Sequence, residues 1–298
     1  MRFRSRLERV SVPSAVAIGN FDGFHAGHRR ILETLVRKAR CQGLCAVVLA
    51  FHPHPRAFFG QPIQLISTDA QRLEALKQLA LDRLFFIDFA AVASLPPFAF
   101  VRTVLLDTLR LKALVVGDDF RFGCGRAGDL DSLARLAAAE GFALVRVPGV
   151  EIDGARVTSS RIRKLLAAGA VDQAGRLLAR PYFIDGVVVR GVGRGRQLGF
   201  PTMNIASANA ILPSGVFRTR LDIAGRGHPS LTNIGRAPTF NDPQRPLRVE
   251  SHVPGFRGQV YGRNVRLHFI DKIRDEREFA SAAELVEQIR RDISSLGI

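Results

Sequence analysis

The first half of the chain alternates short apolar runs with longer amphipathic segments. The apolar runs predict strands at 15–19, 45–51, 83–87, 113–116 and 143–147. The amphipathic segments between them predict helices at 27–42, 68–81, 98–109 and 129–140. Strands that alternate with helices at this spacing form βαβ units, and nearly continuous apolar strands are typical of a parallel sheet covered on both faces. The pattern therefore predicts a doubly wound α/β domain.

The second half of the chain has a different pattern. Residues 159–179 predict two short helices that are interrupted near Gly169, and Pro181 then ends the helical pattern. Gly, Pro and Asn separate the strand-like segments that follow, which is typical of an antiparallel barrel or sandwich. A capping box at Ser281 and Glu284 predicts a closing helix. The predicted strands are 182–190, 216–223, 230–234, 247–253 and 264–270, and the closing helix runs to about residue 294.

The change of pattern at Pro181 predicts two domains. A chain of 298 residues is long enough for two, since one domain takes about 150 residues. We expect an α/β domain at 1–181 and a β domain at 182–298, with a short connection between them.

The chain is strongly basic. It has 43 Lys and Arg against 27 Asp and Glu, a formal net charge of +16 at pH 7, and the excess is spread over both halves. Such a surface attracts polyanions of many kinds, so a nucleic-acid-binding protein is one hypothesis. The chain has no Trp and only two Tyr, which disfavours recognition by base stacking. We therefore expect no nucleic-acid partner.

Cysteine spacing and apolar segment length indicate the compartment. Cys41, Cys45 and Cys124 are odd in number and lack C-x-x-C spacing, so neither a disulfide framework nor a metal site is expected. The most apolar long segment, 85–101, is interrupted by Asp88 and by a Pro-Pro pair, and a membrane helix needs about 20 apolar residues. We expect a cytoplasmic protein with no membrane partner.

Residues 19–28, GNFDGFHAGH, follow the first predicted strand and open the first predicted helix. In an open α/β sheet, ligands bind at the carboxyl ends of strands, and a helix N-terminus offers free N–H groups to a phosphate. His25 and His28 lie on one face of the helix start, and Gly27 removes side-chain bulk. This arrangement suits a polyphosphate, although a polar turn with surface histidines is the alternative.

This segment resembles the HxGH signature of the nucleotidyltransferase superfamily. Its form is similar to that in the adenylyltransferase half of bacterial bifunctional riboflavin kinase/FAD synthetases. Later segments resemble the same family in the same order: FHPHPR at 51–56, VGDDFRFG at 116–123 and TSSRIR at 158–163.

The resemblance implies transfer of an adenylyl group from ATP to FMN, with release of pyrophosphate. His25 and His28 would stabilise the charged transition state, which needs positioning and charge neutralisation more than a covalent nucleophile. The residues implied for ATP and its phosphates are Gly19, Phe21, Asp22, Gly27, Thr158, Ser159, Ser160 and Arg163, and those implied for the flavin are Asp119 and Phe120.

Residues 158–163 also fit this chemistry physically. Hydroxyls at a helix start cap the helix, and Arg161 and Arg163 in its first turn can hold β- and γ-phosphates. An ordinary N-cap is the alternative. His52 and His54 have no apparent third metal ligand, so we expect them in a loop near the nucleotide.

Residues 191–204, GVGRGRQLGFPTMN, form a second Gly-rich segment. Their spacing does not match the G-x-G-x-x-G dinucleotide fingerprint. Glycines interleaved with Arg let backbone N–H groups approach a phosphate, which would suit either a nucleotide or a nucleic acid. GFPTMN resembles the G-F-P-T-x-N signature of riboflavin kinases. Further segments of that family follow in order, NIGRAPTF at 233–240, ESH at 250–252 and IRDE at 273–276.

The kinase resemblance implies a six-stranded antiparallel barrel with a closing helix. It assigns Thr202 and Asn204 to Mg²⁺ and ATP phosphates, and Glu250 as the general base for the ribityl 5′-hydroxyl. A primary alcohol is a poor nucleophile, so a nearby carboxylate aids its attack on the γ-phosphorus. A surface carboxylate at a strand edge is the alternative. Met203 and Phe217 depart from the family's usual small residue and Tyr. The resemblance also implies Gly191, Gly193, Gly195, Arg196, Gly199 and Pro201 for ATP, and Asn233 and Arg274 for the flavin.

The leading hypothesis is a two-domain flavin-cofactor enzyme. Its domain at 182–298 would phosphorylate riboflavin, and its domain at 1–181 would adenylylate FMN to FAD. ATP, riboflavin and FMN are the expected small-molecule substrates, and Mg²⁺ is the expected cofactor. An enzyme with only one active half, or a nucleic-acid-binding protein, are the alternatives.

Overall fold

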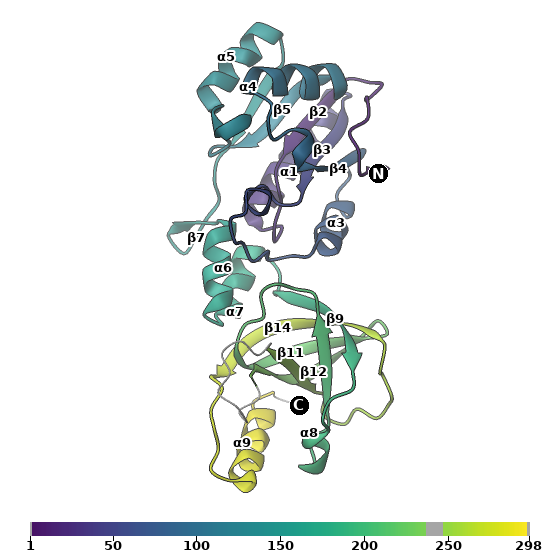
Figure 1. Ribbon diagram of the computed structural model, residues 1–298, viewed down its shortest axis with the longest axis vertical. Helices are drawn as coiled ribbons and strands as arrows, with labels where there is room; N and C mark the ends of the chain where they lie inside the picture. The colour runs from purple at the N-terminus through teal and green to yellow at the C-terminus, as the bar shows by residue number, and fades with distance from the viewer. Residues whose placement is uncertain (1, 237–246, 297–298) are drawn as a thin grey trace. The chain divides into compact units, whose positions relative to one another are not determined.

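The chain folds into two compact units, Met1–Thr158 and Ser159–Ile298 (Figure 1). The computed structural model describes residues 2–236 and 247–296, so residues 237–240 of the NIGRAPTF segment lie outside the described part. The functional division predicted after residue 181 stays a prediction. Within the described residues, we find no helix that combines the length and the apolar composition needed to span a membrane.

The first unit is built on a six-stranded sheet in which every strand pair is parallel. The five predicted strands are confirmed to within two residues at each end. A three-residue edge strand was not predicted, because it contains no apolar run. The strands are β1 (Arg2–Arg4), β2 (Ser14–Ile18), β3 (Cys45–His52), β4 (Arg83–Asp88), β5 (Leu111–Gly117) and β6 (Ala143–Val147), followed by a small antiparallel hairpin of β7 (Glu151–Ile152) and β8 (Ala155–Arg156).

Helices alternate with these strands as predicted. The predicted helix at 98–109 is a π-helix over most of its length, and the backbone N–H of Leu109 donates to the carbonyl of Val104, five residues earlier, at 3.0 Å. The helices are α1 (Ala26–Cys41), α2 (Pro55–Phe58), α3 (Asp69–Lys77), α4 (Pro97–Ala99), the π-helix η2 (Phe100–Thr108) and α5 (Leu130–Glu140), with 3₁₀ turns η1 (Phe89–Ala91) and η3 (Cys124–Arg126).

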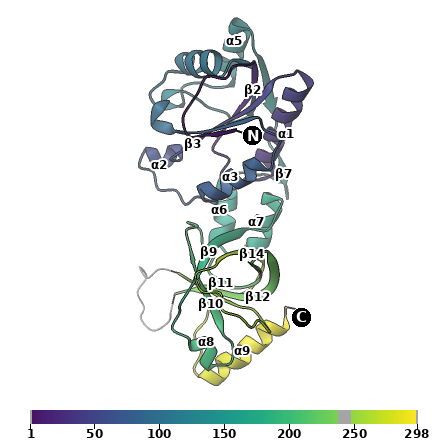
Figure 2. The ribbon, with the colours of Figure 1, turned by 90° about the vertical axis from the view of Figure 1, so that its right-hand side faces the viewer.

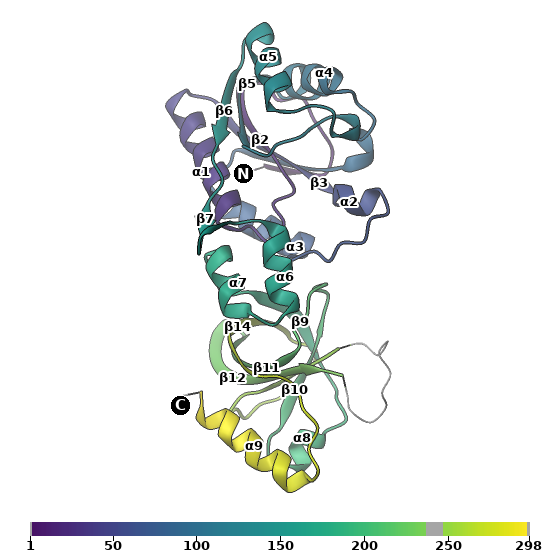
Figure 3. The same ribbon diagram turned by 90° about the vertical axis from the view of Figure 1, so that its left-hand side faces the viewer.

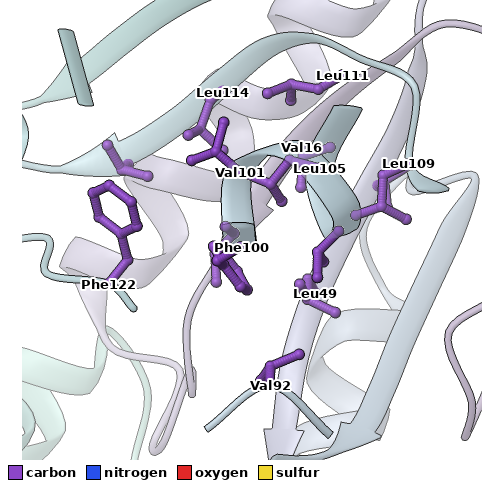
Figure 4. Packing of buried hydrophobic residues seen from close by; sticks show 14 of the residues in the cluster. Val16, Leu49, Val92, Phe100, Val101, Leu105, Leu109, Leu111, Leu114 and Phe122 are labelled. Atoms are coloured by element: carbon purple, nitrogen blue, oxygen red, sulfur yellow. The ribbon is translucent and has the colours of Figure 1, made fainter. Parts of the chain in front are cut away.

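Both faces of the sheet are covered, with α1 on one side and α4 and α5 on the other (Figure 3). Val16 and Ile18 of β2 belong to a core cluster that includes residues of η2 and α5, part of which Figure 4 shows. Ala15 and Ala17 belong to a second cluster, which includes residues of α1 and α3. Because alternate residues of one strand enter opposite cores, the predicted doubly wound α/β domain is confirmed.

The loop after β2 lies where the strand order reverses. The sheet order is β1-β4-β3-β2-β5-β6, so the chain passes from β2 to β3 and β4 on one side and then returns to β5 on the other. The ends of β2 and β5 therefore flank a topological switch point, which is where open α/β sheets bind ligands. Residues 19–28 begin at this point.

The second unit contains two short helices and a closed barrel. The first helix ends at Ala167 and the second begins at Val171, so the predicted break near Gly169 is confirmed. The six strands have the order β10-β13-β12-β11-β14-β9, and all neighbouring pairs are antiparallel, so the barrel is confirmed over the sandwich. The elements are α6 (Ser159–Ala167), α7 (Val171–Leu178), β9 (Phe183–Val189), β10 (Thr202–Ser207), β11 (Gly215–Ile223), β12 (Arg226–Gly235), β13 (Arg248–His252) and β14 (Asn264–Arg274).

The closing helix α9 (Ala282–Ser294) packs on the barrel. Its N-cap is Ser281, whose hydroxyl accepts from the backbone N–H of Glu284 at 3.2 Å. The Glu284 carboxylate accepts from the N–H of Ala280 instead of that of Ser281, so only half of the predicted capping box is formed. Val216 and Leu231 of the barrel form a cluster with Leu296, which follows the helix. Within this unit, α9 and the short helix α8 (Arg194–Gln197) lie at one end of the barrel, and α6 and α7 lie at the other (Figure 2).

Inside the barrel, four fully buried hydroxyl groups form a continuous hydrogen-bonded chain. Oγ1 of Thr219 lies 2.8 Å from Oγ of Ser230 and 2.7 Å from Oγ1 of Thr232. Thr232 donates in turn to Oγ of Ser251 at 3.0 Å. Thr219 and Thr232 each have two hydroxyl neighbours, so the loss of Thr219 interrupts the chain at one of its two inner members.

We expect Thr219→Val to lower the free energy of unfolding of the barrel by about 1–3 kcal/mol, because buried hydroxyls lose a partner. Thr219→Ser keeps the hydroxyl and is expected to be the milder change. Both tyrosines, Tyr182 and Tyr261, lie in the second unit of a chain that has no Trp, so tyrosine fluorescence during urea titration follows this unit. A Ser variant as unstable as the Val variant would contradict the expectation.

Candidate active sites

The loop after β2 has an unusual backbone. Phe21, Gly23 and Phe24 have φ angles of 50°, 79° and 48°. Both phenylalanines are buried, and aromatic residues rarely adopt this left-handed conformation, so the loop is strained. A Cβ on Gly19 would lie 3.0 Å from the Phe21 ring, so this ring needs the glycine beside it.

The two predicted catalytic histidines are brought together at the start of α1. His25 is the N-cap residue, and its Nδ1 accepts from the backbone N–H of His28 at 3.3 Å. The two imidazole rings stack with centroids 3.6 Å apart and planes 18° apart. A Cβ on Gly27 would lie 3.2 Å from the His25 ring, so this glycine also makes room for a functional side chain. The pair lies at the positive end of the helix dipole, which favours an anionic ligand.

The Asp22 side chain is buried in the first unit. It is 1% exposed, and its carboxylate accepts from the backbone N–H groups of Ile66 and Ser67 at 3.2 and 3.1 Å. The structure therefore makes Asp22 a link between the loop and the segment before α3. Its predicted contact with ATP stays a prediction.

The predicted flavin residues of the first unit lie just after β5. Asp119 is largely exposed, and Phe120 is half-buried and stacks on Phe122 with a centroid distance of 5.7 Å. Arg156 forms ion pairs with Asp118 and, at 3.3 Å, with Asp119. The guanidinium therefore neutralises both carboxylates at the edge of the switch point.

The predicted phosphate residues at 158–163 divide between the two units. Thr158 is the last residue of the first unit, and Ser159, Ser160 and Arg163 lie in α6 of the second. Ser160 is exposed and the other three are half-buried. The helix start is confirmed, whereas phosphate binding by these residues stays a prediction.

In the barrel, strand register places three predicted residues in one row. Asn204 of β10 lies opposite Glu250 of β13, which lies opposite Asn233 of β12. Directly opposite residues have Cβ atoms about 4.5–5.5 Å apart and share a face of the sheet. Thr202 lies two residues before Asn204 and is on the same face. The predicted base, the predicted metal ligands and a predicted flavin residue are therefore neighbours.

The Gly-rich segment packs against this row. A Cβ on Gly191 would collide with the side-chain amide of Asn204, and one on Gly195 would collide with the carbonyl of Phe200. Gly193 and Gly199 have φ angles of 80° and 87° and lie in open space. Arg196 is exposed on α8. Close backbone approach to Asn204 explains Gly191, and left-handed turns explain Gly193 and Gly199.

A cavity of about 360 Å³ adjoins Asn204 and Gly191. Arg190 and Arg248 contribute positive charge to it. Its other lining residues are Val189, Val192, Ile205, Leu247 and Val249. Its lining thus combines two arginines and an asparagine with apolar residues.

Pro201 is exposed, and its carbonyl lies 2.9 Å from Nδ1 of His252. Since a carbonyl only accepts, this imidazole nitrogen must carry the proton. His252 is 9% exposed and lies opposite Thr202 in the register. The ESH segment predicts no role for this residue, and its contact with the Pro201 carbonyl fixes the backbone before Thr202.

The structure pairs Arg274, a predicted flavin residue, with Asp292 of α9. Nε and Nη2 of Arg274 donate to Oδ2 of Asp292 at 3.0 and 2.9 Å, and this carboxylate is 2% exposed. The segment after Arg274 brings Glu276 to Asn233, whose Nδ2 donates to the carboxylate at 3.3 Å. Sequence reasoning missed Asp292 as the partner of Arg274, because helical periodicity predicts charged positions of an amphipathic helix to be exposed. Glu276 belongs to the IRDE segment, whose pattern predicts no role for it.

Two candidate phosphate-handling sites, one at the start of α1 and one in the barrel, are typical of a bifunctional phosphate-transferring enzyme. Family models match the same two parts of the chain: FAD synthetase at residues 8–161 and riboflavin kinase at residues 178–296. The chain belongs to the bifunctional riboflavin kinase/FMN adenylyltransferase family.

Relatives of that description match nearly the whole chain. The protein from Pseudomonas fluorescens is 38% identical over 286 residues, which are 93% of this chain and 90% of the relative. The protein from Bacillus subtilis (strain 168) is 34% identical over 295 residues, with 96% and 92% coverage. The protein from Escherichia coli (strain K12) is 35% identical over 291 residues, with 93% and 90% coverage.

A solved structure has the same fold. It is described as a macrolide-efflux protein from Streptococcus pneumoniae, and it is 28% identical with a TM-score of 0.89. The alignment covers 99% of this chain and 98% of that one. The efflux description belongs to that protein, whereas the relatives matched by sequence are named for the two flavin reactions.

We expect Gly191→Ala to lower riboflavin phosphorylation by about 10²-fold, since small displacements of a positioning group have effects of this size. The added methyl must displace the Asn204 amide. FMN adenylylation by the other unit should be unchanged, and separate assays of the two reactions measure both. Gly175→Ala is the matched control, because its Cβ would meet nothing closer than 3.5 Å. Kinase activity in the Gly191 variant equal to that of the control would contradict the role of this glycine.

Proposed function

We propose that the barrel phosphorylates riboflavin to FMN and that the α/β unit adenylylates FMN to FAD, as expected of the family. The observation that supports the first reaction best is the row of Asn204, Glu250 and Asn233. The stacked histidine pair at the start of α1 supports the second. The division of labour follows the predicted domains, 182–298 and 1–181.

In the kinase reaction, we assign Glu250 as the general base. Its carboxylate takes the proton of the ribityl 5′-hydroxyl, the oxygen attacks the γ-phosphorus of ATP, and ADP leaves. Glu250 is half-buried, and the residues directly opposite it on both neighbouring strands are neutral amides, Asn204 and Asn233. A correctly placed base of this kind contributes about 10²–10⁴-fold.

Thr202 and Asn204 fit a magnesium site. Both offer neutral oxygen donors on one face of β10, and Mg²⁺ prefers oxygen ligands, few of them from protein when phosphates supply the rest. The Asn204 amide is also confined by the Gly191 backbone. When bound, Mg²⁺ would neutralise charge on the ATP phosphates. Gly191, Gly193, Gly195, Arg196, Gly199 and Pro201 would surround those phosphates, and Asn233 and Arg274 would contact the flavin.

In the adenylyltransferase reaction, an oxygen of the FMN phosphate attacks the α-phosphorus of ATP and pyrophosphate leaves. His25 and His28 would donate hydrogen bonds to the phosphate oxygens as charge accumulates on them, together with the N–H groups of the helix start. Gly19, Phe21, Asp22 and Gly27 would shape the site. Thr158, Ser159, Ser160 and Arg163 would hold the outer phosphates, and Asp119 and Phe120 would contact the flavin.

We expect the purified chain, incubated with riboflavin, ATP and Mg²⁺, to form FMN first and then FAD. Chromatographic separation with fluorescence detection distinguishes the three flavins. A folded protein that forms neither product would refute the proposal, and formation of FMN alone would refute its adenylyltransferase half.

Two substitutions should separate the reactions. Glu250→Gln is expected to lower FMN formation by about 10²–10⁴-fold while added FMN is still converted to FAD. His28→Ala should do the reverse, with FAD formation falling by about 10²–10³-fold. The control for folding is the activity that each variant should keep: FAD formation from added FMN in Glu250→Gln, and FMN formation in His28→Ala. If either variant lost both activities while folded, the two-site assignment would be wrong.

A further inference from the structure

Arg72 of α3 is a buried cation beside the strained loop of the first unit. Its side chain is 1% exposed, and its Cζ lies 4.8 Å from the centroid of the Phe86 ring. Nη1 donates to the backbone carbonyl of Asn20 at 2.9 Å, and Nη2 forms an ion pair with Asp69. Its Nε is buried with no hydrogen-bond partner within the described residues.

Asp69 extends this contact to a second strand end. Its other oxygen, Oδ2, lies 2.5 Å from Nδ1 of His52, the last residue of β3. Arg72 and Asp69 therefore connect the start of α3 with the end of β3 and with the loop after β2. These are two neighbouring strand ends at the ligand-binding edge of the sheet.

A second attachment joins the same loop to the segment before α3. The buried Asp22 carboxylate accepts from the backbone of Ile66 and Ser67. The Ile66 side chain lies against Gly23, where a Cβ would be 3.0 Å from two of its carbons. The loop is thus held at Asn20 and at Asp22–Gly23, on both sides of Phe21.

The loop needs such attachments because its backbone is strained. Phe21 and Phe24 have positive φ angles, and strained residues keep their conformation only where the surroundings determine it. His25 follows Phe24 directly and His28 stacks on His25, so a relaxed loop would displace both imidazoles.

A buried guanidinium with an unpaired nitrogen is a poor means of stabilising a fold. Desolvation of the buried guanidinium offsets its attraction to the Asp69 carboxylate, which is itself 39% exposed. Here the guanidinium donates to a carbonyl of the strained loop.

We propose that Arg72 is a positioning residue of the adenylyl-transfer site. It acts through the Asn20 carbonyl, which fixes the loop and thereby the imidazoles of His25 and His28. The inference rests on the proposed adenylyltransferase function of this unit. It predicts an effect on the chemical step rather than on substrate binding.

The test uses the full chain with Arg72→Met, Arg72→Lys and Arg72→Gln. We expect Arg72→Met to lower kcat for FAD formation from FMN and ATP by about 10²-fold, with KM for both substrates and riboflavin phosphorylation unchanged. Arg72→Lys keeps a cation and should recover most of the rate. Combined with His28→Ala, Arg72→Met should lower the rate by much less than the product of the two single losses, because the group that it positions is gone.

Leu76→Ala is the control for general destabilisation. It opens a cavity at a fully buried position one turn further along α3, and its urea midpoint shows how far the unit is weakened. Equal kcat losses in Leu76→Ala and Arg72→Met would overturn the proposal. So would a wild-type kcat in Arg72→Met, a change confined to KM, or single losses that multiply in the double variant.

If Arg72→Met does not fold, Arg72→Gln takes its place in the same comparisons, and a wild-type kcat in that variant overturns the proposal. A wild-type chain that forms no FAD would instead refute the proposed function. The two failures are therefore distinguishable.

Discussion

Close contact between a glycine backbone and a functional side chain shapes both candidate active sites. In the α/β unit, the His25 ring lies over Gly27, and in the barrel the Asn204 amide lies against Gly191. Any larger residue at these glycines would displace the group that is expected to meet a phosphate. These glycines make room for the functional side chain, and they also leave backbone N–H groups accessible to the ligand. Both Gly-rich motifs therefore combine glycines with functional residues.

The two units bring their residues together by different means. In the α/β unit, the reversal of strand order places the loop after β2 at the edge of the sheet, and the helix that follows supplies the N–H groups. In the barrel, antiparallel register places Asn204, Glu250 and Asn233 in one row across three strands. A one-residue slip of β13 would turn Glu250 to the other face, so the register itself is a functional constraint.

Sequence patterns predicted the α/β sheet, the barrel and the closing helix, because apolar periodicity reflects which faces are buried. They missed β10, since its first residues belong to a Gly-rich motif that resembles a loop. They could not show the row of Asn204, Glu250 and Asn233, because register depends on pairing between distant segments. Arg72 and Asp292 were missed for a related reason: a charged residue in an amphipathic helix is expected to face solvent, and only tertiary structure reveals its buried partner.

Arg–Asp pairs in which one partner is buried occur beside both sites and account for a few of the 43 basic residues. Arg72 with Asp69 holds the strained loop of the first unit, and Arg274 with Asp292 ties the segment after β14 to α9. Such pairs add little net stability compared with apolar packing, but they fix direction, because a guanidinium bonds carboxylates and carbonyls in defined geometry. A few arginines therefore support the sites, while most of the basic excess lies elsewhere and need not bind any ligand.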